Sequence, residues 1–208
     1  NYEITSDLTG YNTVQTINPS ELNLWRIIRK NSDGSIEMVS EYISNEAISF
    51  YGKEGYKNLV ASLNTIAKQY ETEGITIDSR SFGYRNQTQN LTELSCISGN
   101  SNCLESQGGG DAVHSVEHDV ELVLKALGRI TAKNPSQDEL RPYFLASRYY
   151  DTINYLIRYV ASNGVIYLLS LAGAIHGEST ISLAFRPIVI LKSNIDAITE
   201  KIESMSNI

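Results

Sequence analysis

Apolar and polar residues alternate most clearly between residues 24 and 40. WRIIRK and SIEMVS each have the pattern of a strand with one apolar face, and Asn31-Ser-Asp-Gly34 lies between them. The Asp-Gly pair is typical of tight hairpin turns, because glycine readily adopts the positive φ that such turns need. The pattern predicts a β-hairpin, and we expect Trp25, the only tryptophan, to pack in the core.

Two stretches follow the helical period instead. Residues 55–70 and residues 112–130 both place apolar side chains three and four positions apart. Asp111 follows three glycines and can cap the second helix. The predicted apolar stripes are Leu59, Val60, Leu63, Ile66, Ala67 and Tyr70 in the first helix, and Val113, Val116, Val120, Val123, Leu124, Leu127 and Ile130 in the second.

The other parts of the chain divide by composition. Residues 1–22 are polar and are expected to form an N-terminal arm, residues 23–195 the folded domain, and residues 196–208 a C-terminal tail. Residues 75–110 are rich in Arg, Asn, Gln, Thr, Ser and Gly, which favours a long structured excursion over a strand. Helices and strands that are segregated in this way predict an α+β fold.

The segment from residue 148 to 184 has no clean period. Tyrosines and isolated apolar residues stand among turn signals, of which Asn163-Gly164 is the clearest. A folded protein normally keeps such side chains out of glycine-rich turns unless they face a core or a partner. One interpretation is a surface that displays them to a ligand; the other is a meander in which residues such as Tyr155 and Tyr159 face the core. The many apolar and aromatic residues beside turn signals favour a binding surface.

Charge and hydropathy narrow the choice of partners. The chain of 208 residues is 41% hydrophobic and 20% charged, which is typical of a soluble globular protein. Its net charge of -7 argues against nucleic acid as a partner, because such partners require a basic surface. No apolar run is long enough for a transmembrane helix, so we expect no membrane insertion by this segment. The chain starts at Asn1 rather than Met, so we expect a trimmed protein, and whether a signal or an anchor precedes Asn1 stays open.

Cys96 and Cys103 lie close together in CISGNSNC. Such a loop can close into a disulfide, which would suit an extracytoplasmic protein. Two free thiols are an equal alternative, because spacing alone does not establish geometry. Two sulfurs without a second ligand pair do not predict a zinc site. The sequons at Asn86 and Asn90 matter only in a source that glycosylates.

The string His114-Ser-Val-Glu117-His118 matches the HxxEH arrangement of inverted zinc peptidases. On a helix the two histidines share one face, so both imidazoles can reach one metal, with Glu117 near a bound water. A working site also needs a third ligand, for which Glu121 is a weak candidate. The alternative is a chance motif of solvated residues at the start of a helix. We favour the latter and expect no catalytic residue, no metal and no cofactor.

Five stretches together carry a family resemblance: WRIIRKNSDGSIEMVS, YGKEGYKNLVASLNTIA, YFLASRYY, RYVASNGVIY and FRPIVILKSNI. From about Leu24 to Ile195 the chain resembles bacterial and phage surface proteins whose last domain has the C-type-lectin fold. This variant of the fold is shared with the formylglycine-generating enzyme and with variable proteins of diversity-generating retroelements, including phage receptor-binding proteins such as the major tropism determinant. The resemblance implies an α+β, C-type-lectin-like fold with two main helices packed on a small antiparallel sheet and long loops. Two departures stand out: Ala184 replaces the usual glycine before the FRP strand, and the enzyme's catalytic cysteine pair has no counterpart.

In the retroelement proteins, the residues ahead of the final FRP-like strand are diversified and bind a target. The matching positions here run from Arg148 to Ala184. The resemblance therefore implies a surface-displayed ligand-binding protein of receptor or adhesin type, located outside the cell, on its surface or on a virion. Its partner would be a protein or glycan on another cell or particle. Tyrosine suits such a surface because its ring buries a large area at low rotamer cost. The implied ligand-binding residues are Tyr149, Tyr150, Asp151, Asn154, Tyr155, Tyr167, Leu169, Leu171, His176 and Thr180.

Two alternatives stay open. One is a pilin-like structural subunit, in which an apolar helix ahead of Asn1 would carry assembly. The other is a zinc hydrolase that uses His114, Glu117 and His118.

Overall fold

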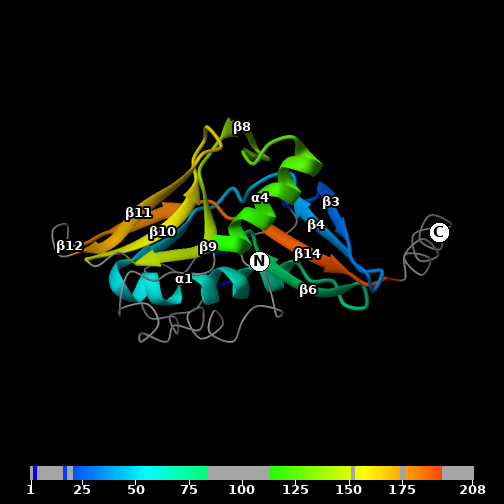
Figure 1. The fold of residues 1–208 in the computed structure, drawn as a ribbon, viewed down its shortest axis with the longest axis horizontal. Helices are drawn as coiled ribbons and strands as arrows, with labels where there is room; N and C mark the ends of the chain where they lie inside the picture. The colour runs from blue at the N-terminus through cyan, green and yellow to red at the C-terminus, as the bar shows by residue number, and fades with distance from the viewer. Residues whose placement is uncertain are drawn as a thin grey trace.

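The computed structural model describes residues 2–3, 16–17, 21–83, 113–150, 153–173 and 177–193. Of these residues, 46% lie in strands and 23% in helices. The strands form two four-stranded sheets and three two-stranded ladders, and the two long helices pack against them (Figure 1). The described part of the chain is therefore dominated by β structure.

The first four-stranded sheet has the order β3-β4-β14-β6. The predicted hairpin is confirmed: β3 (Trp25–Lys30) and β4 (Ile36–Ser40) are antiparallel, and Gly34 in the turn has a φ of 84°. The strand that contains FRPIVIL, β14 (Pro187–Leu191), lies between β4 and β6 (Thr76–Ser81). The last strand of the described residues, β14, thus lies in the interior of this sheet.

The second four-stranded sheet is a meander with the order β12-β11-β10-β9. It consists of β9 (Tyr143–Tyr150), β10 (Asn154–Val160), β11 (Ile166–Gly173) and β12 (Gly177–Glu178), all antiparallel. Gly164, with a φ of 84°, forms the turn between β10 and β11. The segment from residue 148 to 184 therefore consists mainly of strands rather than of outward-facing loops.

Three two-stranded ladders lie outside these sheets in the described residues. β13 (Thr180–Leu183) pairs with β5 (Ile48–Tyr51), which leads directly into the first helix. β7 (Lys133–Asn134) pairs with β8 (Gln137–Leu140), and β1 (Tyr2–Glu3) pairs with β2 (Thr16–Ile17).

Both predicted helices are present. α1 (Gly52–Ala67) continues into a 3-10 turn, η2 (Lys68–Tyr70), and α4 spans Val113–Leu127. α1 runs beneath both four-stranded sheets and contacts β6 as well as β9, β10 and β11 (Figure 1). Its apolar stripe is buried as predicted, from Leu59 to Ala67.

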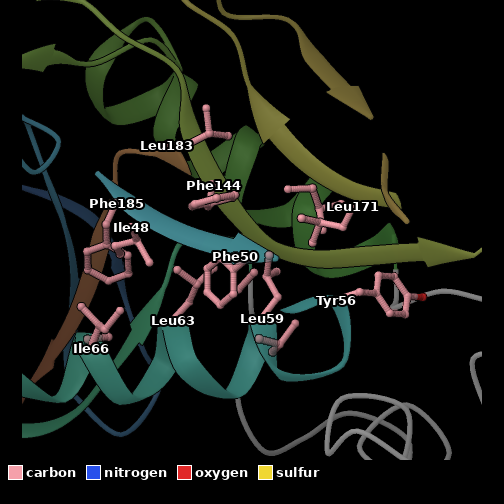
Figure 2. Packing of buried hydrophobic residues seen from close by; sticks show 14 of the residues in the cluster. Ile48, Phe50, Tyr56, Leu59, Leu63, Ile66, Phe144, Leu171, Leu183 and Phe185 are labelled. Atoms are coloured by element: carbon pink, nitrogen blue, oxygen red, sulfur yellow. The ribbon is translucent and has the colours of Figure 1, made fainter. Parts of the chain in front are cut away.

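The main core lies between α1, β5 and the inner face of the β9–β12 sheet. Phe50 and Phe144 meet edge to face at its centre, with ring centroids 5.2 Å apart. Figure 2 shows these rings above the side chains of α1, with Phe185 at one end of the cluster and Tyr56 at the other. The labelled members are Ile48, Phe50, Tyr56, Leu59, Leu63, Ile66, Phe144, Leu171, Leu183 and Phe185.

A second core lies on the other face of β9, beneath α4. It joins α4 to the β3–β4–β14–β6 sheet through Val123, Leu145, Val39 and Ile188. Burial of large apolar side chains contributes roughly 1.5–3 kcal/mol each, so this cluster ties the two sheets together as one unit.

The expectation of a C-type-lectin-like α+β fold, with two helices on one small antiparallel sheet, is wrong. Two four-stranded sheets and three ladders replace the single sheet. Two segments caused the error. The 148–184 segment forms strands, and residues 76–81, predicted to be irregular, form β6. The sequence TIDSRS lacks the apolar pattern of a strand, because its buried residues Ser79, Arg80 and Ser81 are polar.

Candidate ligand-binding site

Several chain segments meet at one end of the β9–β12 sheet, on the left in Figure 1. β9 ends there at Tyr150, which pairs with Tyr155 near the start of β10. β11 ends there at Gly173, which pairs with Asn154 on one side and with Gly177 of β12 on the other. We call this region the loop end; it comprises Tyr149, Tyr150, Ile153, Asn154, Tyr155, Gly177, Glu178, Thr180 and the start of α1 at Tyr51, Gly52 and Lys53.

Three tyrosines form a row at the loop end. The ring of Tyr155 lies 4.9 Å from that of Tyr150 and 5.2 Å from that of Tyr56 on α1, measured between centroids. Tyr56 is fully buried and Tyr155 is 8% exposed, whereas Tyr150 is partly exposed. The ammonium group of Lys53 lies 5.1 Å from the Tyr155 ring centroid, within the range of a cation–π contact. The row therefore leads from the core to the surface.

Two arginines fix the strands that carry this row. Arg148, fully buried, donates from Nη1 to the carbonyl of Lys57 at 2.5 Å and stacks over the Tyr56 ring at 5.6 Å. Arg158 donates to the carbonyl of Arg148 at 2.9 Å and stacks over Tyr149 at 5.6 Å. Because β9 is tied to α1 on one side and to β10 on the other, the loop end is carried by a rigid support.

The start of α1 is tied to β12. The carboxylate of Glu178 accepts from the backbone N–H of Lys53 at 3.3 Å, and the backbone N–H of Gly52 donates to the carbonyl of Ser179 at 3.1 Å. A carboxylate at a helix N-terminus is favoured by the helix dipole. Gly52 has a φ of +57°, and a Cβ there would lie 2.7 Å from Cδ of Glu178. The positive φ favours glycine here, whereas the Glu178 carboxylate is the end of an exposed side chain and can move away from a Cβ.

The rim of the loop end is exposed and chemically mixed. Ile153 is 44% exposed and Tyr51 39%. Lys53 and Glu178 are exposed and supply one positive and one negative charge, and Thr180 opposite Tyr51 adds a hydroxyl. Apolar and aromatic area with a few polar groups is the composition of recognition surfaces.

The ten predicted ligand-binding residues do not form one group in the structure: some lie at the loop end and others lie in the core. Tyr149, Tyr150 and Asn154 are partly buried at the loop end, and Thr180 is exposed there. Tyr155 and Leu171, at 8% and 0% exposure, belong to the core, so their prediction as surface contacts is wrong; Leu169 packs against the same core. They face inward because alternate residues of a strand point to opposite faces of the sheet.

Of the other three predicted residues, the structure describes Tyr167, which does not join this group. Tyr167 is 44% exposed but lies toward the opposite end of the sheet, where its ring is 6.0 Å from that of Tyr159. Asp151 and His176 lie outside the described residues. Tyr51, Lys53 and Tyr56 were missed because they come from a distant part of the sequence, and no local pattern places the start of α1 beside β12.

The zinc motif receives no support from the side chains that are described. Nε2 of His118 lies 3.2 Å from Nη1 of Arg29. Since a guanidinium only donates, Nε2 is the acceptor of this bond and a cation sits where a metal would bind. The side chains of His114 and Glu117 lie outside the described set, as do Cys96, Cys103, Asn86 and Asn90. Within that set, no three His, Cys, Asp or Glu residues gather in a metal-binding arrangement.

His118 instead borders a buried ionic cluster that docks α4. Asp119, fully buried, accepts from Nη1 and Nη2 of Arg80 at 2.6 and 2.8 Å and from the backbone N–H of Gly83 at 2.6 Å. Glu37 bridges Arg80 and Arg29. Burial alone would raise the pKa of Glu37, but the two arginines outweigh it and hold that pKa below its ordinary value. The cluster is a structural connection between α4 and the sheet.

Comparison with protein-family models, characterised proteins and solved structures finds no match to this chain. Neither helix in the described ranges has the length and hydropathy needed to cross a bilayer.

Proposed function

We propose that the chain is a surface-displayed ligand-binding protein of receptor or adhesin type, which contacts its ligand at the loop end. The observation that supports this proposal is that the ends of β9 and β11 meet the start of α1 on a support fixed by Arg148, which is buried, and Arg158. Binding residues commonly lie on connections that a rigid scaffold positions.

The chemistry of the rim suits a protein or glycan on another cell or particle. Tyr150 and Tyr51 offer ring surface with a polar hydroxyl, and tyrosine is enriched at binding hot spots. Lys53 and Glu178 flank this surface with opposite charges. They can bind hydroxyl or amide groups of a ligand while the tyrosine rings contact its apolar face. The rigidity of the support limits the entropy lost on binding.

The proposal extends to diversification by a retroelement, as in the proteins that the sequence resembles. Under this proposal the exposed loop-end positions between residues 148 and 184 vary, whereas Arg148, Tyr155 and Leu171 do not, since each is buried and packed.

Sequencing this gene in many isolates of its source population tests the extension. We expect substitutions to concentrate at codons 150–154 and 174–180, with the codons of Arg148, Tyr155 and Leu171 unchanged. Substitutions spread evenly over the gene would contradict diversification while leaving a fixed binding surface. Substitutions at the three buried codons, with the loop end constant, would contradict the placement of the binding site.

A further inference from the structure

One edge of the β9–β12 sheet has no neighbouring strand over half the length of β11. β11 pairs with β10 from Ile166 to Gly173, with an irregularity at Leu171, but β12 pairs only with Ala172 and Gly173. The next two carbonyls, of Leu171 and Ser170, accept from the backbone N–H and the hydroxyl of Ser179, both at 2.9 Å. From Ile166 to Leu169, no strand of the described residues lies on this side.

The hairpin fixes which backbone groups face this edge. Ala161 donates its N–H to the carbonyl of Val165 at 3.0 Å and accepts from the N–H of Gly164 at 2.9 Å, so position 161 and the carbonyl of Val165 form a hydrogen-bonded site of the hairpin. Because hydrogen-bonded pairs alternate along an antiparallel ladder, the N–H and C=O groups of Ile166, Leu168 and Ser170 point away from β10. The bond from the Ser179 hydroxyl to the carbonyl of Ser170 agrees with this assignment.

The open edge lacks the features that normally prevent strand pairing. The sequence of β11, IYLLSLAG, has no charge and no proline. By contrast, the edge strands of the other four-stranded sheet carry charges, such as Arg26 on β3 and Asp78 on β6. Natural proteins protect free edges with charged side chains, proline or bulges. Moreover, Tyr167 and Leu168 on the open edge are 44% and 46% exposed.

We propose that β11 pairs with β11 of a second copy of this chain, antiparallel about a two-fold axis that passes beside Tyr167. In this register Ile166 of each copy faces Leu168 of the other, and their outward groups form four hydrogen bonds. Tyr167 then lies directly opposite its own counterpart, in a pair without backbone hydrogen bonds, where side chains approach closely.

Two observations favour a second copy over a strand of another protein. The outward groups of Ile166 and Leu168 are placed symmetrically about Tyr167, so one strand satisfies the other completely in a self-complementary contact. The strand is also uncharged, so two copies bring no like charges together. The second β11 would begin opposite Leu168 and would not reach Ala172 and Gly173, the part of the edge that β12 covers.

The dimer would join two four-stranded sheets into one continuous sheet. Because the paired strands run in opposite directions, the two loop ends would lie at opposite ends of this sheet. The contact itself does not depend on what binds at the loop end.

Sedimentation velocity over a wide range of protein concentrations tests the proposal. The wild-type chain is expected to form dimers as concentration rises. Tyr167→Lys is expected to abolish the dimer, because the two-fold axis places two ammonium groups opposite each other. Leu168→Pro is expected to do the same, because proline removes an N–H that faces outward and leaves the ladder to β10 intact.

Leu124→Lys is the matched control, since Leu124 is 45% exposed and lies on α4, which packs against β3 and β9 rather than against the open edge of β11. It should dimerise like the wild type, and circular dichroism should show all three variants folded. A wild-type chain that is monomeric at every concentration would overturn the proposal. So would a Tyr167→Lys variant that is folded and remains as dimeric as the wild type.

Discussion

Replacement of Asp119 by alanine should be among the most destabilising single substitutions in the described part of the chain. The Asp119 carboxylate is fully buried and accepts three short hydrogen bonds, two from Arg80 and one from the backbone of Gly83. Without it, the guanidinium of Arg80, itself 2% exposed, loses its two shorter ionic bonds. Glu37, at 3.3 Å from Arg80, is already paired with Arg29.

The expected cost follows from this geometry. Removing one partner of a buried ion pair typically destabilises a protein by about 3–5 kcal/mol, because the remaining charge stays buried without compensation. The loss of the bond to Gly83 leaves a buried N–H unsatisfied and contributes to the same total. We expect a decrease of about 4 kcal/mol in the free energy of unfolding, a large part of the total stability of a typical domain.

Equilibrium unfolding in urea, followed by the fluorescence of Trp25, measures this change. Trp25 packs edge to face on Tyr70 at 6.1 Å, so its emission should report on the folded core. Asp138→Ala is the control, because Asp138 pairs with Lys133 but its side chain is 87% exposed, and such surface pairs contribute at most about 1 kcal/mol. Adding Arg80→Met to Asp119→Ala should recover part of the loss, since it removes the uncompensated charge. A cost for Asp119→Ala no larger than that for Asp138→Ala would refute the reasoning.

Two further predictions use the same assay. Gly52→Ala should destabilise the chain by about 1–3 kcal/mol, because alanine is strained at its positive φ. Gly74→Ala, with a φ of +79° and open space around it, should cost about the same, since the exposed Glu178 side chain can move away from a Cβ at position 52. A negligible loss for Gly52→Ala would contradict the assigned backbone strain. The pKa of Glu37 in the folded state is below its ordinary value of 4.5. Ionised Glu37 therefore adds to the free energy of unfolding above pH 4.5, and this addition is lost as the pH falls through the lower, folded-state pKa. Unfolding measured from neutral to acid pH should therefore show a steeper loss for the wild type than for Glu37→Gln, and identical profiles would contradict this assignment.

Local patterns predicted individual elements well. The Asp-Gly turn identified the β3–β4 hairpin, and the apolar period identified α1 and most of α4, because these signals depend on neighbours in the sequence. β6 was missed because Arg80 is buried by an ion pair with Asp119, a residue from a distant helix. A buried charge and its partner cannot be matched from spacing alone.

The candidate site was predicted only in part, for a similar reason. The sequence directed attention to residues 148–184, but the side on which each tyrosine lies depends on strand register. Tyr155 faces the core because it pairs with Tyr150 on an inner face that α1 covers, and the contact between Gly52 and Glu178 joins positions far apart in the chain. Neither fact has a local signature.

The account's central claim is that ligands bind at the loop end. The most direct measurement is binding of the purified, labelled chain to a printed glycan array and to a panel of intact bacterial cells. We predict that Ile153→Asp and Lys53→Glu each abolish the signal that the wild type gives, whereas Ile77→Asp, at a position 53% exposed on β6, preserves it. If the two loop-end variants are folded and bind these targets as strongly as the wild type and Ile77→Asp, the binding site lies elsewhere and the claim is wrong.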